Sequence, residues 1–499
     1  MCIIFGAKSK KGQDVSEPVL RMIRSIVSDF PKSKSMFVHL QDTALKLDLS
    51  ERKDRIQLPE STTVSGVVCL ITDDQNCYVV QESESSSVSL IGKIFNLTNA
   101  PSSIMESFAR ISNSVDDFEK SSRLLLESLD GQYAFALRRE NLLLLARDPI
   151  GTKPLYVGEN NRLIAFSSRC RPLWEIGIKD CKMLGQPILV HDGRSERVRS
   201  GIWLESKRKD RAELVDSLIT KLSQAIKKMA SPSGNRINIL FSGGLDSSVI
   251  AKLSKDLGIR PTLLCAGTPL SRDIINARRM SSALDLPLIE KEISPEDITD
   301  SLFQVIRTIE SAEMIPVSTS LPFHFALEMC ADRGEKGTVL HGQGADELFC
   351  GYKRYETTLS DKGYKALCSE MLRDVVRLGE AIPLYDKMGT ATGKELFAPF
   401  AELSVVGFSL GVPIQLKLSE ESSEFIRKRI LRELANKIGV PMRLLPKEKV
   451  AAQFGSGAAK IMDKAARRAG FTRDVAKRKG FPLPIQAYLK EISQSLRFP

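Results

Sequence analysis

The hydrophobic and polar positions follow different patterns in the two parts of the chain. Residues 1–190 contain short apolar runs, separated by turn residues, at Val64–Leu70, Cys77–Val80, Tyr133–Leu137, Leu142–Ala146 and Leu163–Phe166. Short runs at this spacing are typical of β-strands in a sheet-rich, layered structure. A polar and charged stretch, 191–211, follows them and is predicted to be a linker.

From residue 212 onward, strands alternate with longer helices. The expected order is strand Ile237–Phe241, a helix ending near Leu257, strand Thr262–Ala266, helix Asp273–Leu284, then strands Pro287–Ile293 and Thr338–His341. This alternation predicts βαβ units in a doubly wound parallel sheet, and helical patterns dominate from Glu356 onward. We therefore expect an α/β protein with domains at 1–190 and 212–499.

Composition narrows the class of protein. The chain has 499 residues, 42% of them hydrophobic, and nine cysteines without paired spacing. The longest apolar run is far shorter than the ~20 residues that cross a bilayer, and no secretory signal is expected. The odd, scattered cysteines predict reduced thiols and a cytoplasmic location.

The formal net charge of +11 raises the question of a nucleic-acid partner. Basic residues are densest from Lys447 to Lys479, where they interleave with apolar residues at helical spacing. This pattern favours a solvated helix face and a few lysines that hold a polyphosphate. No nucleic-acid or membrane partner is expected.

The most specific motif is Ser242-Gly243-Gly244-Leu245-Asp246-Ser247-Ser248, which follows a strand and opens a helix. The glycines let the backbone approach an anion, and the helix start offers free N–H groups. Asp246 would be repelled by a bound phosphate unless a cation such as Mg²⁺ joins them. The simpler alternative is a Gly-Ser turn that only caps a helix.

These residues match the pyrophosphatase loop, S-G-G-x-D-S, of enzymes that split ATP into AMP and pyrophosphate, and the chain resembles the asparagine synthetase family. Further matches are Gly342-Gln343-Gly344-Ala345-Asp346-Glu347-Leu348-Phe349, the segments Val317–Pro322 and Ala398–Glu402, and Lys449 before Gly455-Ser456-Gly457. The resemblance implies an adenine nucleotide α-hydrolase-like domain that uses ATP and Mg²⁺.

The resemblance also implies residue roles. Ser242, Gly243, Gly244 and Ser247 would hold pyrophosphate, and Asp246 and Asp346 would bind Mg²⁺. Phe241, Ala266, His341 and Gly342 would enclose adenosine, and Lys449 would stabilise the charge that develops during adenylate formation. Gln343 replaces the family's glutamate, which is thought to deprotonate the attacking amine. Since an amide is not a base, Glu347 or the leaving phosphate would take that proton.

The first part of the chain carries a second site. Removal of Met1 would leave Cys2 with a thiol nucleophile and its own α-amine as the base. The runs 147–156, RDPIGTKPLY, and 130–135, DGQYAF, resemble class II glutamine amidotransferases. This resemblance implies an N-terminal-nucleophile αββα sandwich, in which Asp130 contacts the glutamine amine and Gly92 lies in the oxyanion hole.

The glutaminase pocket departs from the family pattern. Ile3 and Ile91 replace a glycine and the side-chain amide of the oxyanion hole, Lys93 reverses a charge, and the family's R-G-P-D stretch has no counterpart. Losing such an oxyanion donor costs about 2.7 to 4 kcal/mol of barrier. These substitutions predict that ammonia is a better nitrogen donor than glutamine.

Three functions remain open from the sequence. The first is an asparagine synthetase that acts on aspartate with glutamine or ammonia. The second is a related carboxylate–amine ligase, similar to β-lactam synthetase, that acts on another acid. The third is a regulatory paralog that binds ATP without turnover. The sequence is compatible with a homodimer and does not determine the oligomeric state.

Overall fold

The computed structural model describes residues 2–29, 35–39, 44–48, 66–72, 78–83, 86–97, 103–104, 106, 115–198, 201, 210–231, 234, 236–421, 424–446 and 452–498. The chain divides into two compact units. Unit 1 comprises Met1–Ile202 with Phe498–Pro499, and unit 2 comprises Trp203–Arg497.

Unit 1 contains two antiparallel sheets. The first has the strand order β11-β9-β10-β1-β4-β2-β3 and the second β13-β12-β8-β7-β6-β5. The strands are β1 (Cys2–Ser9), β2 (Ser35–His39), β3 (Ala44–Asp48), β4 (Gly66–Thr72), β5 (Tyr78–Ser83), β6 (Ser86–Ile94), β7 (Gly131–Arg139), β8 (Leu142–Arg147), β9 (Tyr156–Glu159), β10 (Leu163–Ser167), β11 (Lys182–Met183), β12 (Ile188–His191) and β13 (Arg194–Arg197).

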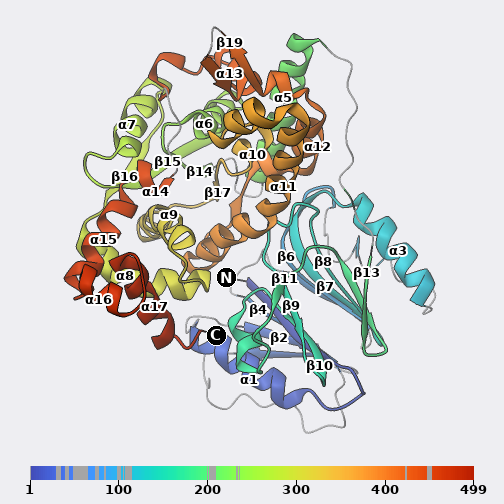
Figure 1. Cartoon of the computed structure of the whole chain (residues 1–499). Helices are drawn as coiled ribbons and strands as arrows, with labels where there is room; N and C mark the ends of the chain where they lie inside the picture. The colour runs from blue at the N-terminus through green and yellow to red at the C-terminus, as the bar shows by residue number, and fades with distance from the viewer. Residues whose placement is uncertain are drawn as a thin grey trace. The chain divides into compact units, whose positions relative to one another are not determined.

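Three apolar layers hold these sheets together. Alternate residues of β1 point to opposite faces, so Phe5 packs under α1 (Ser16–Asp29) and α4 (Arg171–Glu175), whereas Ile4 faces the second sheet. Ile91 and Phe166 belong to that same inter-sheet core. Helix α3 (Val115–Ser128) covers the outer face of the second sheet (Figure 1). The predicted αββα sandwich is therefore confirmed.

The stretch 191–211 differs from the predicted linker at its start. Residues 191–197 complete the β12–β13 hairpin, in which Ile188 pairs with Arg197. All four residues of β13 are exposed, because this strand lies at the sheet edge. An exposed edge strand therefore has the polar composition that resembled a linker.

Unit 2 is built on a parallel sheet with the strand order β16-β15-β14-β17-β18. The strands are β14 (Arg236–Leu240), β15 (Arg260–Gly267), β16 (Leu288–Glu292), β17 (Thr338–Leu340) and β18 (Leu396–Phe397). The predicted doubly wound sheet is confirmed, because the chain leaves the central strand β14 in one direction and later returns to its other side.

Helices cover this sheet and form the predicted helical extension. They are α5 (Arg211–Ala230), α6 (Leu245–Asp256), α7 (Arg272–Leu284), α8 (Pro295–Ile309), α9 (Met314–Asp332), α10 (Ala345–Phe349), α11 (Arg354–Thr392), α12 (Leu403–Gly411), α13 (Arg429–Lys437), α14 (Ala452–Gly455), α15 (Ala458–Arg468), α16 (Arg473–Arg478) and α17 (Pro484–Ser495). Short 3-10 turns lie at Pro399–Ala401, Ile414–Leu416 and Met442–Leu444, and a small hairpin joins β19 (Leu418–Glu421) to β20 (Glu424–Arg427).

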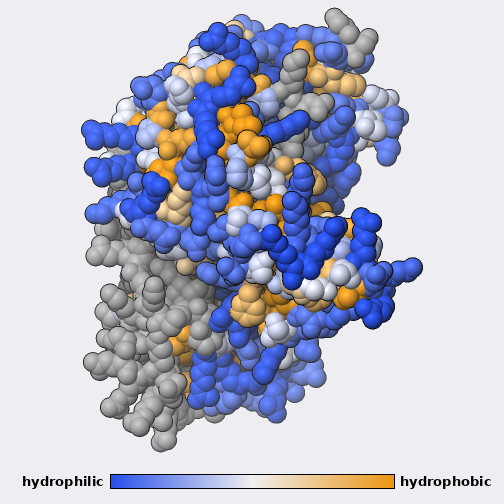
Figure 2. Space-filling view, turned by 90° about the vertical axis from the view of Figure 1, so that its left-hand side faces the viewer, coloured by the Kyte–Doolittle hydropathy of each residue, from blue (hydrophilic) through white to orange (hydrophobic). Residues whose placement is uncertain are grey.

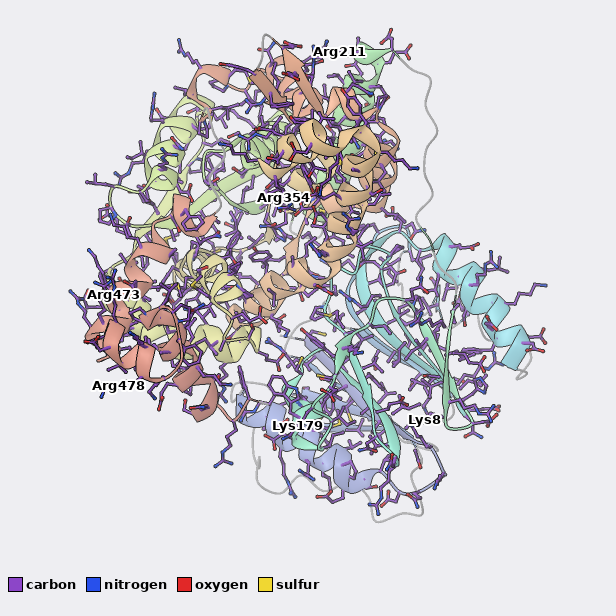
Figure 3. The ribbon with its side chains drawn as sticks, viewed as in Figure 1. Lys8, Lys179, Arg211, Arg354, Arg473 and Arg478 are labelled. Carbon is purple, nitrogen blue, oxygen red and sulfur yellow. The ribbon has the colours of Figure 1, made fainter. Side chains whose placement is uncertain are left out.

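The described residues that are visible in Figure 2 are largely hydrophilic. On the face drawn in Figure 2, hydrophobic residues appear in small groups between hydrophilic ones. Among the described helices, none is long and apolar enough to cross a membrane. Arg473 and Arg478, labelled in Figure 3, project from α16, and neighbouring basic residues are paired, such as Lys479 with Glu491 at 2.7 Å. The predicted helical face of basic residues is thus present.

Candidate active site

The site in unit 2 lies where the strand order reverses. Strand β14 pairs with β15 on one side and with β17 on the other, and all three run parallel. The loops after β14 and β17 therefore leave the same edge of the sheet as neighbours, although the chain continues from them to opposite sides of β14. In open α/β sheets, ligands bind in the crevice that forms at such a switch point.

The loop after β14 has the predicted glycine-rich geometry. Phe241 is buried, and its backbone N–H donates to Leu264 O at 2.8 Å. Gly243 has φ +67°, and a Cβ there would lie 2.5 Å from the backbone carbonyl of Asn276 in α7. Gly244 is the N-cap of α6, so Ser242 and Ser247 lie at the start of that helix. The predicted anion-binding residues therefore come together at one helix N-terminus.

The loop after β17 approaches the first one closely. His341 is buried, and its N–H donates to Phe397 O at 3.1 Å. A Cβ on Gly342 would lie 3.0 Å from the Asp246 Cβ, so only a residue without a side chain fits comfortably beside that aspartate. Gly344, with φ +97°, then begins α10, which carries Asp346 and Glu347. Ala266, at the end of β15, lies at the same edge.

Asp246 and Asp346 meet at a single ammonium group. Lys428 Nζ lies 2.6 and 2.7 Å from the two carboxylate oxygens of Asp246 and 2.7 Å from Asp346 Oδ1. The side chains of Lys428, Asp246 and Asp346 are 6%, 13% and 12% exposed. The structure thus brings both predicted metal-binding carboxylates to one buried position.

This pair fits the coordination that Mg²⁺ requires. The described residues contain no group of three or more His, Cys, Asp or Glu side chains that could form a complete metal cage. Mg²⁺ is commonly bound through one or two carboxylates together with substrate phosphates. Asp246 and Asp346, beside the start of α6, would supply the two carboxylates of that arrangement.

Lys428 was not identified as a site residue from the sequence. It lies in a basic run, Arg427-Lys428-Arg429, directly before an amphipathic helix. Its own backbone is left-handed, with φ 55° and ψ 38°, and it caps α13. The Lys428 N–H donates to Phe349 O at 3.1 Å, which ties it to the end of α10. A contact between residues 182 positions apart cannot be read from sequence spacing.

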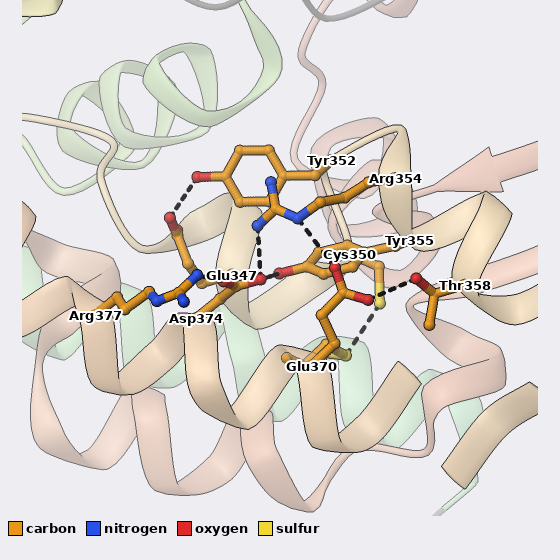
Figure 4. A network of polar contacts seen from close by, with 10 residues as sticks. Glu347, Cys350, Tyr352, Arg354, Tyr355, Thr358, Glu370, Asp374 and Arg377 are labelled. Atoms are coloured by element: carbon orange, nitrogen blue, oxygen red, sulfur yellow. Dashed lines mark hydrogen bonds and ion pairs between the residues drawn. The ribbon is translucent and has the colours of Figure 1, made fainter. Parts of the chain in front are cut away.

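Glu347 belongs to a buried network at the start of α11 (Figure 4). Glu347 is 8% exposed, and its Oε1 accepts a hydrogen bond from the Tyr352 hydroxyl. Burial and the Glu347 carboxylate raise the pKa of Tyr352, so that hydroxyl stays protonated and donates. The Arg354 guanidinium lies 4.1 Å from the centre of the Tyr352 ring and donates to Asp374 at 2.6 Å. The network therefore fixes Glu347 beside Asp346.

The glycine loop near the C-terminus docks at the end of β15. Thr268 N–H donates to Ser456 O at 2.8 Å, and a Cβ on Gly457 would lie 2.6 Å from the Thr268 hydroxyl. Lys449, the predicted catalytic lysine, lies outside the described residues, so its role stays a prediction.

Glu402 has a structural role. It is 2% exposed, pairs with Lys228 at 2.7 Å and accepts from the N–H groups of Ser404 and Val405 as the N-cap of α12. Burial raises the pKa of Glu402, but the hydrogen bonds from Lys228 and Ser404 outweigh it and lower that pKa overall.

In unit 1, Cys2 starts β1 and packs against the inter-sheet core, with its Sγ 3.9 Å from Leu90 O of β6. The Cys2 sulfur is disulfide-bonded in this structure. The expectation of uniformly reduced thiols is therefore wrong for Cys2, although Cys69, Cys170, Cys181, Cys265, Cys330, Cys350 and Cys368 are free. A disulfide sulfur is not a nucleophile, so the predicted role of Cys2 requires reduction.

The motif that follows β8 organises a loop. Buried Asp148 accepts from the N–H groups of Ile150, Gly151 and Thr152, at 3.1, 2.9 and 3.0 Å. Burial raises the pKa of Asp148, and its hydrogen bonds with Thr152 oppose that shift. Arg147 donates to Lys153 O at 2.6 Å. These residues therefore fix the backbone conformation of the loop that follows β8.

The predicted glutamine-binding residues lie on adjoining strands. Gly92 has φ +82°, and a Cβ there would lie 2.1 Å from Gln132 O, so β6 and β7 can approach each other only because it is glycine. Asp130, directly before β7, is tied to the end of β6, because its N–H donates to Asn96 Oδ1 at 3.0 Å. Ile91 is 4% exposed and lies in the inter-sheet core, where it contributes no polar donor.

The two units together define a class of protein. A parallel sheet with two glycine loops at its switch point, in one chain with an αββα sandwich, is the architecture of a glutamine amidotransferase-type ligase. The sequence matches the model of the Asparagine synthase family over residues 218–383 and 361–483. It matches the model of the Glutamine amidotransferase domain family over residues 68–175. The chain therefore belongs to the asparagine synthase family, whose members are ligases.

Several relatives bear the name of glutamine-hydrolysing asparagine synthetases. The chain is 33% identical to a Methanocaldococcus jannaschii protein so named, over 70% of this chain and 73% of that protein. Matches to proteins of Zea mays and Escherichia coli K12 have 25% and 26% identity over 63% and 62% of this chain. The chain spans 56% and 58% of those two relatives' length.

Proposed function

We propose that this protein is an ATP-dependent asparagine synthetase that forms β-aspartyl-AMP and pyrophosphate, then transfers nitrogen to the activated carboxyl group. The observation that carries the proposal is the convergence of two glycine loops and two aspartates at the sheet's switch point. Phosphoryl and acyl transfer both develop negative charge on oxygen, which such a preorganised polar site stabilises.

The residues divide the work between two steps. An aspartate side-chain oxygen attacks the α-phosphorus, and pyrophosphate departs toward the N–H groups at the start of α6, near Ser242, Gly243 and Ser247. Asp246 and Asp346 would hold Mg²⁺, which would supply positive charge to offset that of the departing phosphates. The backbone at Phe241, Ala266, His341 and Gly342 encloses adenosine, and Lys449 stabilises the first transition state.

The second step needs a proton acceptor, because an amine that attacks the acyl carbon must lose a proton as AMP leaves. Gln343 cannot serve, since its amide is not a base. Glu347, buried beside Asp346, and the phosphate oxygen of the departing AMP are the two acceptors that remain. Substitution of Glu347 separates them.

Ammonia is the proposed preferred nitrogen donor. Ile91 is buried where the family places a polar donor, and Cys2 must be reduced before it can attack glutamine. Gly92 and Asp130 would complete the glutamine pocket. A cytoplasmic location and a homodimer remain further expectations from the sequence.

Gln343 stands where the family has a glutamate, and this difference supports a second candidate function. In that function the protein is a ligase of the same fold that acts on another carboxylic acid. Pyrophosphate release measured across a panel of carboxylic acids, with ammonium present, distinguishes the candidates. Dependence on aspartate supports an asparagine synthetase, and dependence on another acid supports the second function. Absence of pyrophosphate with every acid would contradict both.

A further inference from the structure

Lys428 holds the centre of the candidate metal site. Its ammonium lies within 2.7 Å of three oxygens on two aspartates that are 100 residues apart in the chain (346 − 246). All three side chains are largely buried, so solvent screens their charges weakly. The ammonium is thus the counter-ion that allows two like-charged carboxylates to lie together.

The surrounding backbone is shaped around this contact. Lys428 adopts a left-handed backbone conformation, with φ 55° and ψ 38°, which L-residues other than glycine seldom adopt. A Cβ on Gly351 would collide with Asp346 Oδ1 and lie 2.4 Å from Lys428 Cε, so Gly351 leaves room for both groups. Arg432 N–H donates to Lys428 O at 2.8 Å, in the first turn of α13. The fold therefore fixes the position of the Lys428 side chain, which is not a flexible surface lysine.

A divalent cation and this ammonium compete for the same carboxylate oxygens. Lone-pair directions of Asp246 that point to Lys428 Nζ are not available to a metal at the same time. We infer that Lys428 is a built-in counter-ion for Asp246 and Asp346. When no nucleotide is bound, it prevents Mg²⁺ from binding to these two carboxylates, so that the metal enters the site only together with ATP.

Arrival of the nucleotide changes this balance. Phosphate oxygens add negative charge beside the carboxylates, so the site then accommodates Mg²⁺ and the ammonium together. Lys428 moves from the aspartates toward the phosphates as the metal takes its place. The inference rests on the proposed nucleotide site but not on the identity of the acceptor acid. According to this inference, Mg²⁺ binds only when the nucleotide binds. An ion pair with a purely structural role would not impose that order.

The test measures thermal unfolding of the full-length protein in EDTA and in millimolar MgCl₂, without nucleotide. The variant is Lys428→Met, and the matched control is Lys417→Met. Lys417 is also buried, and burial lowers its pKa to about 8, while the charges of Cys350 and Cys368 oppose that shift. The two aspartates are not among the groups that shift its pKa. The parent and the control should hardly respond to MgCl₂, whereas Lys428→Met should gain about 4 °C or more in Tm.

Binding measured by calorimetry gives a second readout. Lys428→Met should bind Mg²⁺ alone at least about tenfold more tightly than the parent. With Mg²⁺ and the uncleavable analogue α,β-methylene-ATP, the parent should bind the metal as well. Equal responses of the parent and Lys428→Met to MgCl₂ would overturn the inference, as would tight binding of Mg²⁺ alone by the parent.

If Lys428→Met is insoluble, the double variant Asp346→Asn/Lys428→Met decides, because it removes one charge of each sign. Recovery of a soluble protein with a cooperative melt supports the counter-ion role, and a double variant as unstable as the single one contradicts it. Failure of the inference is distinct from failure of the proposed function, because the parent's pyrophosphate release with aspartate is measured separately.

Discussion

At the residue scale, the central feature is the pair of carboxylates beside the two glycine loops that follow β14 and β17. Asp246 lies in the first turn of α6 and Asp346 in the first turn of α10, and both are mostly buried. A phosphate bound at the positive start of α6 would repel both carboxylates unless a divalent cation lay between them. Their roles can therefore be tested by removing one charge at a time.

Asp246→Asn and Asp346→Asn should each lower pyrophosphate release by at least about 10² while leaving the fold intact, because one metal-binding charge is lost. The measurement is pyrophosphate release, with circular dichroism as the check on folding. Asp256→Asn is the matched control, since Asp256 lies at the other end of α6, pairs with Lys252 and is 43% exposed. Near-parental release by either site variant would remove the Mg²⁺ assignment.

Glu347→Gln should separate the two chemical steps. If Glu347 accepts the proton of the attacking amine, adenylate formation persists while asparagine formation falls by about 10² to 10⁴. Isotope exchange between pyrophosphate and ATP, with aspartate present, reports the first step alone. Equal losses in exchange and in amide formation would show that Glu347 only supports the loop that carries Asp346.

At the element scale, the pattern of strands and helices was predictable where it depended on local residue order. The four predicted strands from Ile237 to His341 lie within one or two residues of β14, β15, β16 and β17. Strands β14, β15 and β17 are mostly buried and apolar, as parallel strands covered on both faces are expected to be. The β12–β13 hairpin was misread, because exposed edge strands carry polar side chains. The site residues of both glycine loops were predictable, whereas Lys428 depends on a tertiary contact.

Gly243 offers a prediction for the loop between β14 and α6. Gly243→Ala should weaken ATP binding by about tenfold or more, because its φ of +67° and the nearby Asn276 carbonyl both exclude a Cβ. Gly258→Ala is the control, since Gly258 also has a positive φ, +73°, but no atom within 4 Å of the added Cβ. Calorimetric titration with α,β-methylene-ATP measures the effect, and equal losses in both variants would contradict the close-packing argument.

Helix α9 carries a buried histidine that links stability to pH. Burial, and to a lesser extent the charge of Lys291, lower the pKa of His324 to about 4, and Glu328 lies 4.0 Å away. The unfolded chain binds a proton near its ordinary pKa of about 6.5, so stability is lost as the pH falls from about 6.5 to 4.

His324→Gln should remove roughly 3 kcal/mol of that pH dependence, since glutamine does not titrate. Urea unfolding of the parent and the variant at several pH values in this window provides the measurement. An unchanged slope of unfolding free energy against pH in the variant would show that His324 is not the titrating group.

At the scale of the whole molecule, one chain contains a glutamine amidotransferase domain and an asparagine synthase domain. Ammonium should support faster asparagine formation than glutamine, by about 10² or more, because the oxyanion position at Ile91 lacks a polar donor. Any glutamine-dependent rate should require dithiothreitol, since Cys2 is disulfide-bonded, and should vanish in Cys2→Ala. Efficient use of glutamine without reductant would show that the pocket works despite its substitutions.

The proposed acyl-adenylate is tested most directly by following an oxygen atom. When the aspartate side-chain carboxylate attacks the α-phosphorus, the bond between that oxygen and phosphorus persists after the amine displaces AMP. Aspartate labelled with heavy oxygen in its side-chain carboxylate, incubated with ATP, Mg²⁺ and ammonium, should therefore yield AMP with one labelled phosphate oxygen, in equal amount to asparagine. Unlabelled AMP, or label that appears in inorganic phosphate beside ADP, would contradict the account.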